Sequence, residues 1–180
     1  MILLTSDVSD YCEKAWDVSD AAHRLLAWAV EEYWGIKCPE IDKKPGGKPY
    51  FPGEKDRFFS LSHTGKQILA GLSRGELGVD IERVRPMHGG LSERIFSEEI
   101  RAQFDFFEAW TLREAVFKLT GQGSLLSMEL KKKDGAVVTP YAGVRCRSYY
   151  TIPGHAVSVA AYAGDFPEQI KNIPPEKFLS

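Results

Sequence analysis

The stretch Trp110-Thr-Leu-Arg-Glu114-Ala-Val-Phe-Lys118, followed by Leu-Thr-Gly121-Gln-Gly123, is the most informative part of the chain. It contains good helix formers and neither Gly nor Pro before Gly121, so it predicts a helix that ends where Gly121 can adopt a positive φ. Glu114 and Lys118 are four residues apart and therefore share one helix face. Taken alone, they form an ordinary surface ion pair worth about 0.3–0.5 kcal/mol.

Segments upstream of this helix change that interpretation: Phe59-Ser-Leu-Ser62-His63 and Gly78-Val-Asp80-Ile-Glu82. The second segment alternates, which places Asp80 and Glu82 on one face of a strand. Paired carboxylates on one face indicate either a solvated strand surface or a magnesium site, because Mg²⁺ prefers one or two carboxylates together with substrate phosphates and waters. Glu114 completes such a site if the helix packs over the strand.

Composition narrows the function classes. The chain has 180 residues, which suits one domain or two small halves that share a core, and 43% of its residues are hydrophobic. A net charge of −2 argues against a nucleic-acid-binding protein. We see no membrane span and no signal peptide, and we interpret Cys12, Cys38 and Cys146 as free thiols. We therefore expect a cytoplasmic protein.

The first half of the chain reads as a strand, a helix and a hairpin. We expect a strand over 2–5, a helix over roughly 21–33 with an N-cap at Ser19-Asp20, a polar loop over 39–56, and a hairpin with strands 57–62 and 67–72 around a turn at 63–66. Lys43, Lys44 and Lys48 make the loop locally positive, which by charge patterning alone indicates a solvated loop.

The second half repeats this order with longer insertions. We expect a strand over 77–84, a helix from Ser97 through Phe117, a hairpin over 128–139 around Asp134-Gly135, and strands over 144–150 and 155–162. The tail from Asp165, with its prolines, is expected to be irregular and peripheral.

The segments FSLSH, GVDIE and WTLREAVFKLTGQG, with Gly47-Lys48-Pro49-Tyr50-Phe51, occur in the order typical of one family. They resemble the Sfp-type 4′-phosphopantetheinyl transferases. Ser60 departs from the pattern, because that family usually has Asn there. A basic run before the first helix is also missing, since residues 7–19 contain only Lys14.

The resemblance implies an α+β fold, the 4′-phosphopantetheinyl transferase fold, with pseudo-symmetric α/β halves in one chain. We expect the N-terminal half to span 1–75 and the C-terminal half, which carries the metal and catalytic residues, to span 76–180. The cofactor is expected at their junction, in keeping with the preference of ligands for clefts between substructures.

The resemblance also implies an activity, the transfer of 4′-phosphopantetheine from coenzyme A to a serine of an acyl or peptidyl carrier protein, with release of 3′,5′-ADP. Asp80, Glu82 and Glu114 are the implied ligands of Mg²⁺, for which Mn²⁺ can substitute. Glu114 is the implied base, acting directly or through water, and Lys118 the implied phosphate-neutralising catalytic residue. The implied cofactor-binding residues are Lys48, Ser62, His63 and Lys118. The expected partners are coenzyme A and the carrier protein, and the chain is expected to be a monomer that binds neither nucleic acid nor membrane.

Rival functions stay open on the sequence. One is another Mg²⁺-dependent phosphoryl-transfer or hydrolytic enzyme that uses the same carboxylates. Another is a non-catalytic module that binds coenzyme A or a carrier protein, although such a module has no need of a base beside a metal.

Overall fold

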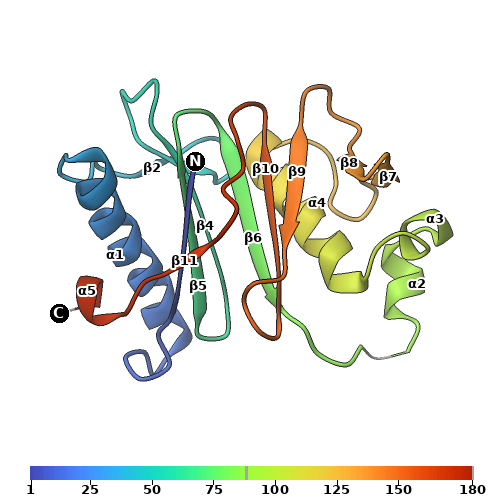
Figure 1. Ribbon diagram of the computed structural model, residues 1–180, viewed down its shortest axis with the longest axis horizontal. Helices are drawn as coiled ribbons and strands as arrows, with labels where there is room; N and C mark the ends of the chain where they lie inside the picture. Colours follow the sequence, from blue (N-terminus) through green and yellow to red (C-terminus); the bar gives the residue numbers. More distant parts are fainter. Residues whose placement is uncertain (88, 180) are drawn as a thin grey trace.

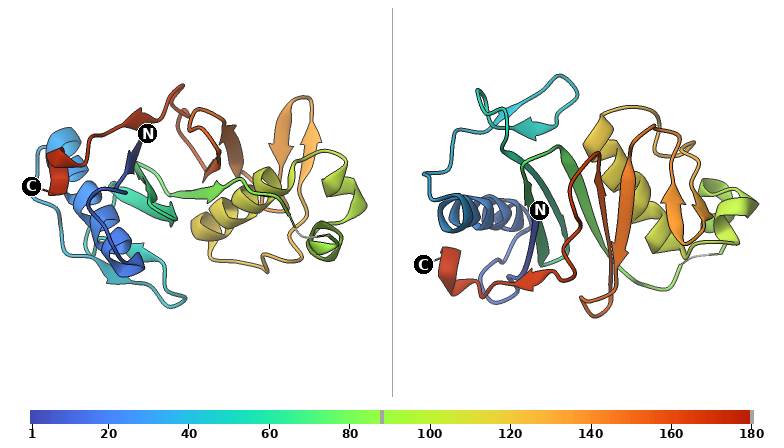
Figure 2. Two further views of the ribbon diagram at one scale, coloured as in Figure 1. Left: turned by 90° about the horizontal axis from the view of Figure 1, so that it is seen from below. Right: turned by 45° about the horizontal axis from the view of Figure 1, so that its top comes forward.

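The computed structural model describes residues 1–87 and 89–179, apart from the side chains of residues 15 and 16. Helix α1 (Ala15–Trp34) lies on one side of the main strands and helix α4 (Phe106–Thr120) on the other (Figure 1). The layers therefore run helix, sheet, sheet, helix, with an apolar cluster between each successive pair. Figure 2 shows the same arrangement from below and from an oblique angle.

The first sheet has the strand order β11-β1-β5-β4. Its strands are β1 (Ile2–Asp7), β4 (Phe58–Thr64), β5 (Gln67–Ser73) and β11 (Lys171–Asn172). Strands β4 and β5 form a tight hairpin in which Thr64 pairs with Gln67. The turn is therefore only Gly65-Lys66, shorter than the predicted turn over 63–66, so Ser62 and His63 lie within the strand.

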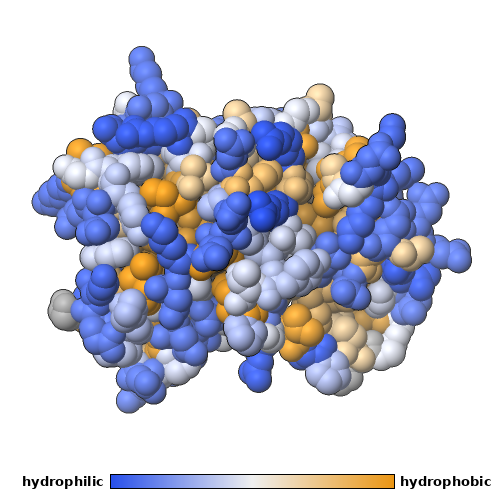
Figure 3. Space-filling model, viewed as in Figure 1, coloured by the Kyte–Doolittle hydropathy of each residue, from blue (hydrophilic) through white to orange (hydrophobic). Residues whose placement is uncertain are grey.

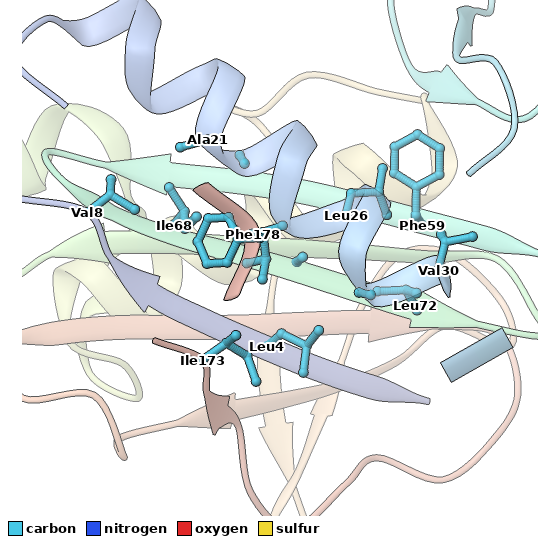
Figure 4. Packing of buried hydrophobic residues seen from close by; sticks show 14 of the residues in the cluster. Leu4, Val8, Ala21, Leu26, Val30, Phe59, Ile68, Leu72, Ile173 and Phe178 are labelled. Atoms are coloured by element: carbon cyan, nitrogen blue, oxygen red, sulfur yellow. The ribbon is translucent and has the colours of Figure 1, made fainter. Parts of the chain in front are cut away.

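Helix α1 packs on this sheet through an apolar face that includes Leu25, Leu26, Ala29 and Val30, all fully buried. The close-up in Figure 4 shows part of this packing, in which Leu26 and Val30 face Phe59 and Leu72. The helix ends at Trp34, close to the predicted end at residue 33, and Gly35 caps it with φ 65°.

The predicted start of this helix at residue 21 is wrong, because the helix begins at Ala15. The Asp17 carboxylate accepts the backbone N–H of Lys14 at 2.9 Å and so satisfies a donor at the first turn. Asp20 lies inside the helix, where it pairs with Arg24 instead of capping.

The second sheet has the strand order β6-β10-β9, from β6 (Leu77–Arg83), β10 (His155–Ala161) and β9 (Arg145–Tyr149). Helix α4 packs on its outer face. Gly78 makes this close approach possible, since a Cβ there would collide with the backbone carbonyl oxygen of Ala115 and would lie 2.7 Å from the backbone nitrogen of Leu119.

The predicted single helix over 97–117 is wrong. A short helix α2 (Leu91–Ile95) is followed by α3 (Glu98–Arg101), and the chain then breaks before α4 begins after Asp105. Asp105 has extended backbone geometry and stands at the N-cap of α4. The Ser97 start is confirmed, because its hydroxyl accepts the Ile100 N–H at 3.4 Å.

Small hairpins complete the periphery. Strand β2 (Asp42–Lys43) pairs with β3 (Pro49–Tyr50), which folds the loop that carries Lys44 and Lys48. Strand β7 (Lys131–Lys133) pairs with β8 (Ala136–Val138) around Asp134-Gly135, as predicted.

The expectation of an irregular, peripheral tail is wrong. Strand β11 adds to the first sheet parallel to β1, and helix α5 (Glu176–Leu179) packs against α1. Ile173 and Phe178 are buried in the cluster under α1 (Figure 4). The end of the chain thus returns to the first half.

The expected α+β class and the two similar halves are confirmed. In each half a strand and a helix precede a hairpin, and the second strand of the hairpin pairs with the first strand of the half, as β5 with β1 and β10 with β6. The boundary between residues 75 and 76 stays a prediction. No helix in the described ranges combines the length and the apolar character needed to cross a membrane. The face seen in Figure 3 is largely hydrophilic, with scattered hydrophobic patches.

Candidate functional site

The candidate site lies where strand β4 of the first sheet runs beside strand β6 of the second. The strands are joined by hydroxyl groups, since Ser60, Ser62 and Thr64 alternate along β4 and their side chains accept backbone N–H groups of β6. The contacts are Val79 N–Ser60 Oγ at 3.0 Å, Ile81 N–Ser62 Oγ at 3.4 Å and Arg83 N–Thr64 Oγ1 at 3.4 Å. We call this set of hydroxyls, Ser60, Ser62 and Thr64, the hydroxyl seam.

Asp80 is the central acidic residue of the site. Its neighbours Val79 and Ile81 point into the core between the sheets, so Asp80 points to the α4 side. Its Oδ1 accepts the Ser62 hydroxyl at 2.7 Å and pairs with Lys118 Nζ at 2.7 Å. The residue is only 4% exposed, which excludes the solvated strand face for this carboxylate.

Lys118 pairs with this strand carboxylate across the helix–sheet contact. Besides Asp80, its ammonium donates to the backbone oxygen of Val79 at 3.1 Å. Among the residues that the structure describes, no ion pair joins Lys118 to Glu114. The ordinary surface pair of the helix is therefore replaced by a contact between α4 and β6.

Glu82 and Glu114 lie near Asp80 and are half-buried. Burial raises the pKa of both carboxyl groups above the ordinary value, and the charge of Asp80 raises the pKa of each further. Opposing contributions come from Lys118 for both and from the Thr64 hydroxyl for Glu82. The structure thus brings together the three carboxylates that the sequence singled out.

Lys48 reaches the same region from the loop between β2 and β3. Its ammonium donates to the backbone oxygen of Leu119 at 2.9 Å, at the C-terminal end of α4, where a positive charge is favoured. Burial lowers the pKa of Lys48. Lys48 therefore ties the first half to the helix that carries Glu114 and Lys118.

His63 is the predicted site residue that the structure keeps apart. It is exposed and lies on the opposite face of β4 from Ser62 and Asp80. Its proposed contact with a phosphate stays a prediction.

A cleft of about 620 Å³ opens between the halves beside these residues. The loop at Lys44–Pro49, the β4 residues 59–61 and the last turns of α4 line it, and its lining residues include Lys48, Glu114 and Lys118. Asp80 is connected to the cleft through the Lys118 ammonium.

The fit to a divalent cation rests on a buried carboxylate oxygen. Within residues 1–87 and 89–179, Asp80 Oδ2 is buried and has no hydrogen-bond partner. In the same described residues, no cluster of three His, Cys, Asp or Glu side chains is arranged to hold a metal by itself. These observations fit a magnesium ion whose shell is completed by substrate phosphates and waters rather than one held by a cage of protein ligands.

Sequence reasoning missed the seam residues Ser60 and Thr64. In the sequence, Ser60 stands out only as a departure from the family pattern, and Thr64 falls in the predicted turn over 63–66. The alternation of hydroxyl residues along 60–64 was the signal that could have found them, because such residues share one strand face.

Comparison with known proteins follows the same segments. The family model described as "4'-phosphopantetheinyl transferase superfamily" matches residues 76–151. The chain is 26% identical to 4'-phosphopantetheinyl transferase ffp of Bacillus subtilis and 24% identical to 4'-phosphopantetheinyl transferase Sfp of Bacillus subtilis (strain 168), in each case over 99% of this chain and 91% of the relative. It is 38% identical to 4'-phosphopantetheinyl transferase AcpT of Escherichia coli (strain K12), over 46% of this chain and 49% of the relative. The matched region contains Asp80, Glu82, Glu114 and Lys118, and the similarity to the two transferases of Bacillus subtilis extends along nearly the whole chain.

Proposed function

We propose that this protein transfers 4′-phosphopantetheine from coenzyme A to a serine of an acyl or peptidyl carrier protein and releases 3′,5′-ADP. The observation that carries the proposal is the meeting of Glu114 and Lys118 at one cleft between the halves, with Asp80 paired to Lys118 and Lys48 on the facing loop. The names of the relatives support the same activity.

In this reaction the carrier serine oxygen attacks the β-phosphorus of coenzyme A. A new P–O bond forms to the serine, the bond to the bridging oxygen breaks, and 3′,5′-ADP leaves with that electron pair. The serine proton passes to Glu114 directly or through a water. The raised pKa of Glu114 suits this role, because a general base works best with a pKa near the operating pH.

Asp80, Glu82 and Glu114 are the residues that would hold Mg²⁺ or Mn²⁺. A bound cation supplies charge neutralisation for the pyrophosphate oxygens. Lys118 is held by Asp80 and the backbone oxygen of Val79, which takes two of the three hydrogens of its ammonium. The remaining hydrogen is directed by these contacts and is available to a phosphate oxygen at the cleft.

Lys48, Ser62 and His63 are the proposed residues on the coenzyme A side. Lys48 lines the cleft and supports this role directly. Ser62 acts from within the seam, where its hydroxyl now donates to Asp80. We propose a cytoplasmic monomer that binds neither nucleic acid nor membrane.

The test is incubation of the purified protein with coenzyme A, Mg²⁺ and a carrier protein without its prosthetic group. The mass of the intact carrier should increase by one phosphopantetheine, and 3′,5′-ADP should accumulate. A carrier with its acceptor serine changed to alanine is the control, and excess EDTA should stop the reaction.

The rivals predict different results. Release of 3′,5′-ADP without the acceptor serine would identify a hydrolase that uses the same carboxylates. Binding of coenzyme A without any 3′,5′-ADP would identify a non-catalytic module.

A further inference from the structure

The hydroxyl of Thr64 both donates and accepts a hydrogen bond with strand β6. It accepts the N–H of Arg83 at 3.4 Å and donates to Glu82 Oε2 at 3.1 Å. A hydroxyl has a single hydrogen to donate. Because the hydroxyl oxygen accepts the Arg83 N–H, the hydroxyl hydrogen points to the Glu82 carboxylate.

Without this contact, the Glu82 side chain would be free to change rotamer. Glu82 is half-buried near the end of β6 and follows Asp80 on the same strand face. The negative charges of Asp80 and Glu82 repel each other, which favours rotamers that take the Glu82 carboxylate away from Asp80. A hydrogen bond from β4 opposes this movement.

We propose that Thr64 is a positioning residue that holds the Glu82 carboxylate in place for the divalent cation of the transfer reaction. This inference rests on the proposed function, since it assumes that Asp80, Glu82 and Glu114 hold a cation. Thr64 itself touches neither substrate nor metal in this proposal. Hydrogen-bond partners of metal ligands typically contribute about 10- to 100-fold to metal affinity.

Ser60 provides a matched control within the same seam. Its hydroxyl accepts the Val79 N–H at 3.0 Å, a shorter contact than that of Thr64 with Arg83. In the portion of the chain that the structure describes, Ser60 has no carboxylate acceptor. If Thr64 acts only by joining the sheets, Ser60→Ala should be at least as damaging as a change at Thr64.

The experiment is a titration of the full chain with Mn²⁺, in which free Mn²⁺ is measured by electron paramagnetic resonance, with and without coenzyme A and with a blank of coenzyme A alone. The Thr64→Val variant keeps the shape of the side chain and removes the hydroxyl. We expect it to weaken Mn²⁺ binding by at least about 10-fold. Thr64→Ser, which restores the hydroxyl, and Ser60→Ala should both bind Mn²⁺ with an affinity close to that of the wild type.

A cycle with Glu82→Gln sharpens the assignment. In that background the Thr64→Val change should have no further effect on Mn²⁺ affinity, because the carboxylate that Thr64 orients is gone. Thr64→Ala replaces Thr64→Val if the valine variant does not fold, as judged by its thermal unfolding.

Several results would overturn the inference. These are wild-type Mn²⁺ affinity in both hydroxyl-free variants, an equal loss in Ser60→Ala, and a wild-type protein that binds no Mn²⁺ under either condition. Failure of the proposed function looks different, because the wild type would then leave the carrier protein unmodified while the differences in Mn²⁺ affinity persist.

Discussion

The two halves share one topology but differ in the side chains that join the helix to the sheet. Helix α1 meets the first sheet through apolar side chains such as Leu25, Leu26 and Val30. Helix α4 meets the second sheet through apolar residues together with buried polar groups, such as Thr111, whose hydroxyl lies 2.8 Å from that of Ser158. It also holds Glu114 and Lys118 at the seam. The contact of α1 with the first sheet rests on these apolar side chains, whereas the contact of α4 with the second sheet also holds charged side chains beside the cleft.

The largest loss of stability should come from adding a side-chain atom where β6 and α4 are in close contact. Gly78→Ala places a Cβ against the backbone of α4, which cannot move aside as a side chain can. We expect a loss of about 3 kcal/mol in the free energy of unfolding, which corresponds to a fall in Tm of about 6–12 °C. Thermal and urea unfolding would measure it.

Gly71→Ala is the matched control from β5 in the first sheet. Its Cβ would meet side-chain atoms, Val79 Cγ1 at 2.7 Å and Leu77 Cδ1 at 2.8 Å, and these can shift. The loss should be nearer about 1 kcal/mol. Equal losses at Gly71 and Gly78 would contradict the idea that backbone contact makes the second half more demanding.

A smaller loss of stability should follow from removing the Lys118 ammonium. Lys118→Met leaves the buried Asp80 carboxylate without its charged partner, so we expect a loss of about 1–3 kcal/mol in the free energy of unfolding. Arg24→Met removes an exposed pair with Asp20 in α1 and should cost about 0.5 kcal/mol or less. The measurement is urea unfolding of each variant.

A double variant separates pairing from packing at this position. Asp80→Asn combined with Lys118→Met should be less destabilised than the sum of the single changes, because no unpaired buried charge remains. Additive losses would mean that Lys118 stabilises the fold through its aliphatic stem and not through Asp80.

The smallest effect concerns pH. Burial and Asp80 raise the pKa of Glu114, so its ionised form is disfavoured in the folded protein. That penalty is fully present above the folded-state pKa and disappears as the pH falls below the ordinary value of 4.5. Glu114→Gln should therefore raise the Tm of the metal-free protein by about 1–3 °C at pH 8, with a smaller gain at pH 4.

Calorimetric scans at these pH values, in the presence of EDTA, would test this expectation. Glu32→Gln, on the outer part of α1, is the control and should change Tm little at either pH. A gain that is the same at pH 4 and pH 8 would place the origin of the effect outside the charge of Glu114.

Much of the fold was predictable from local chemistry. The strand over 77–84 follows from alternation, the end of α1 from Gly35 and the end of α4 from Gly121, and the β7–β8 hairpin from Asp134-Gly135. Signals of this kind involve residues near one another in the chain, so a pattern can carry them. The break at Asp105 and the packing of the tail depend on partners far away in the sequence, which no local pattern records.

The sequence by itself determined which residues we propose for the chemistry, because Asp80, Glu82, Glu114 and Lys118 stand in segments whose order resembles one family. Only the tertiary structure decided how they are connected. Lys118 binds Asp80 instead of Glu114, Lys48 binds the end of α4, and Thr64 binds Glu82. The physical reason is that these contacts cross between elements, so they depend on how closely β4, β6 and α4 pack. Gly78 allows α4 to approach β6 this closely, because it has no Cβ to meet the α4 backbone.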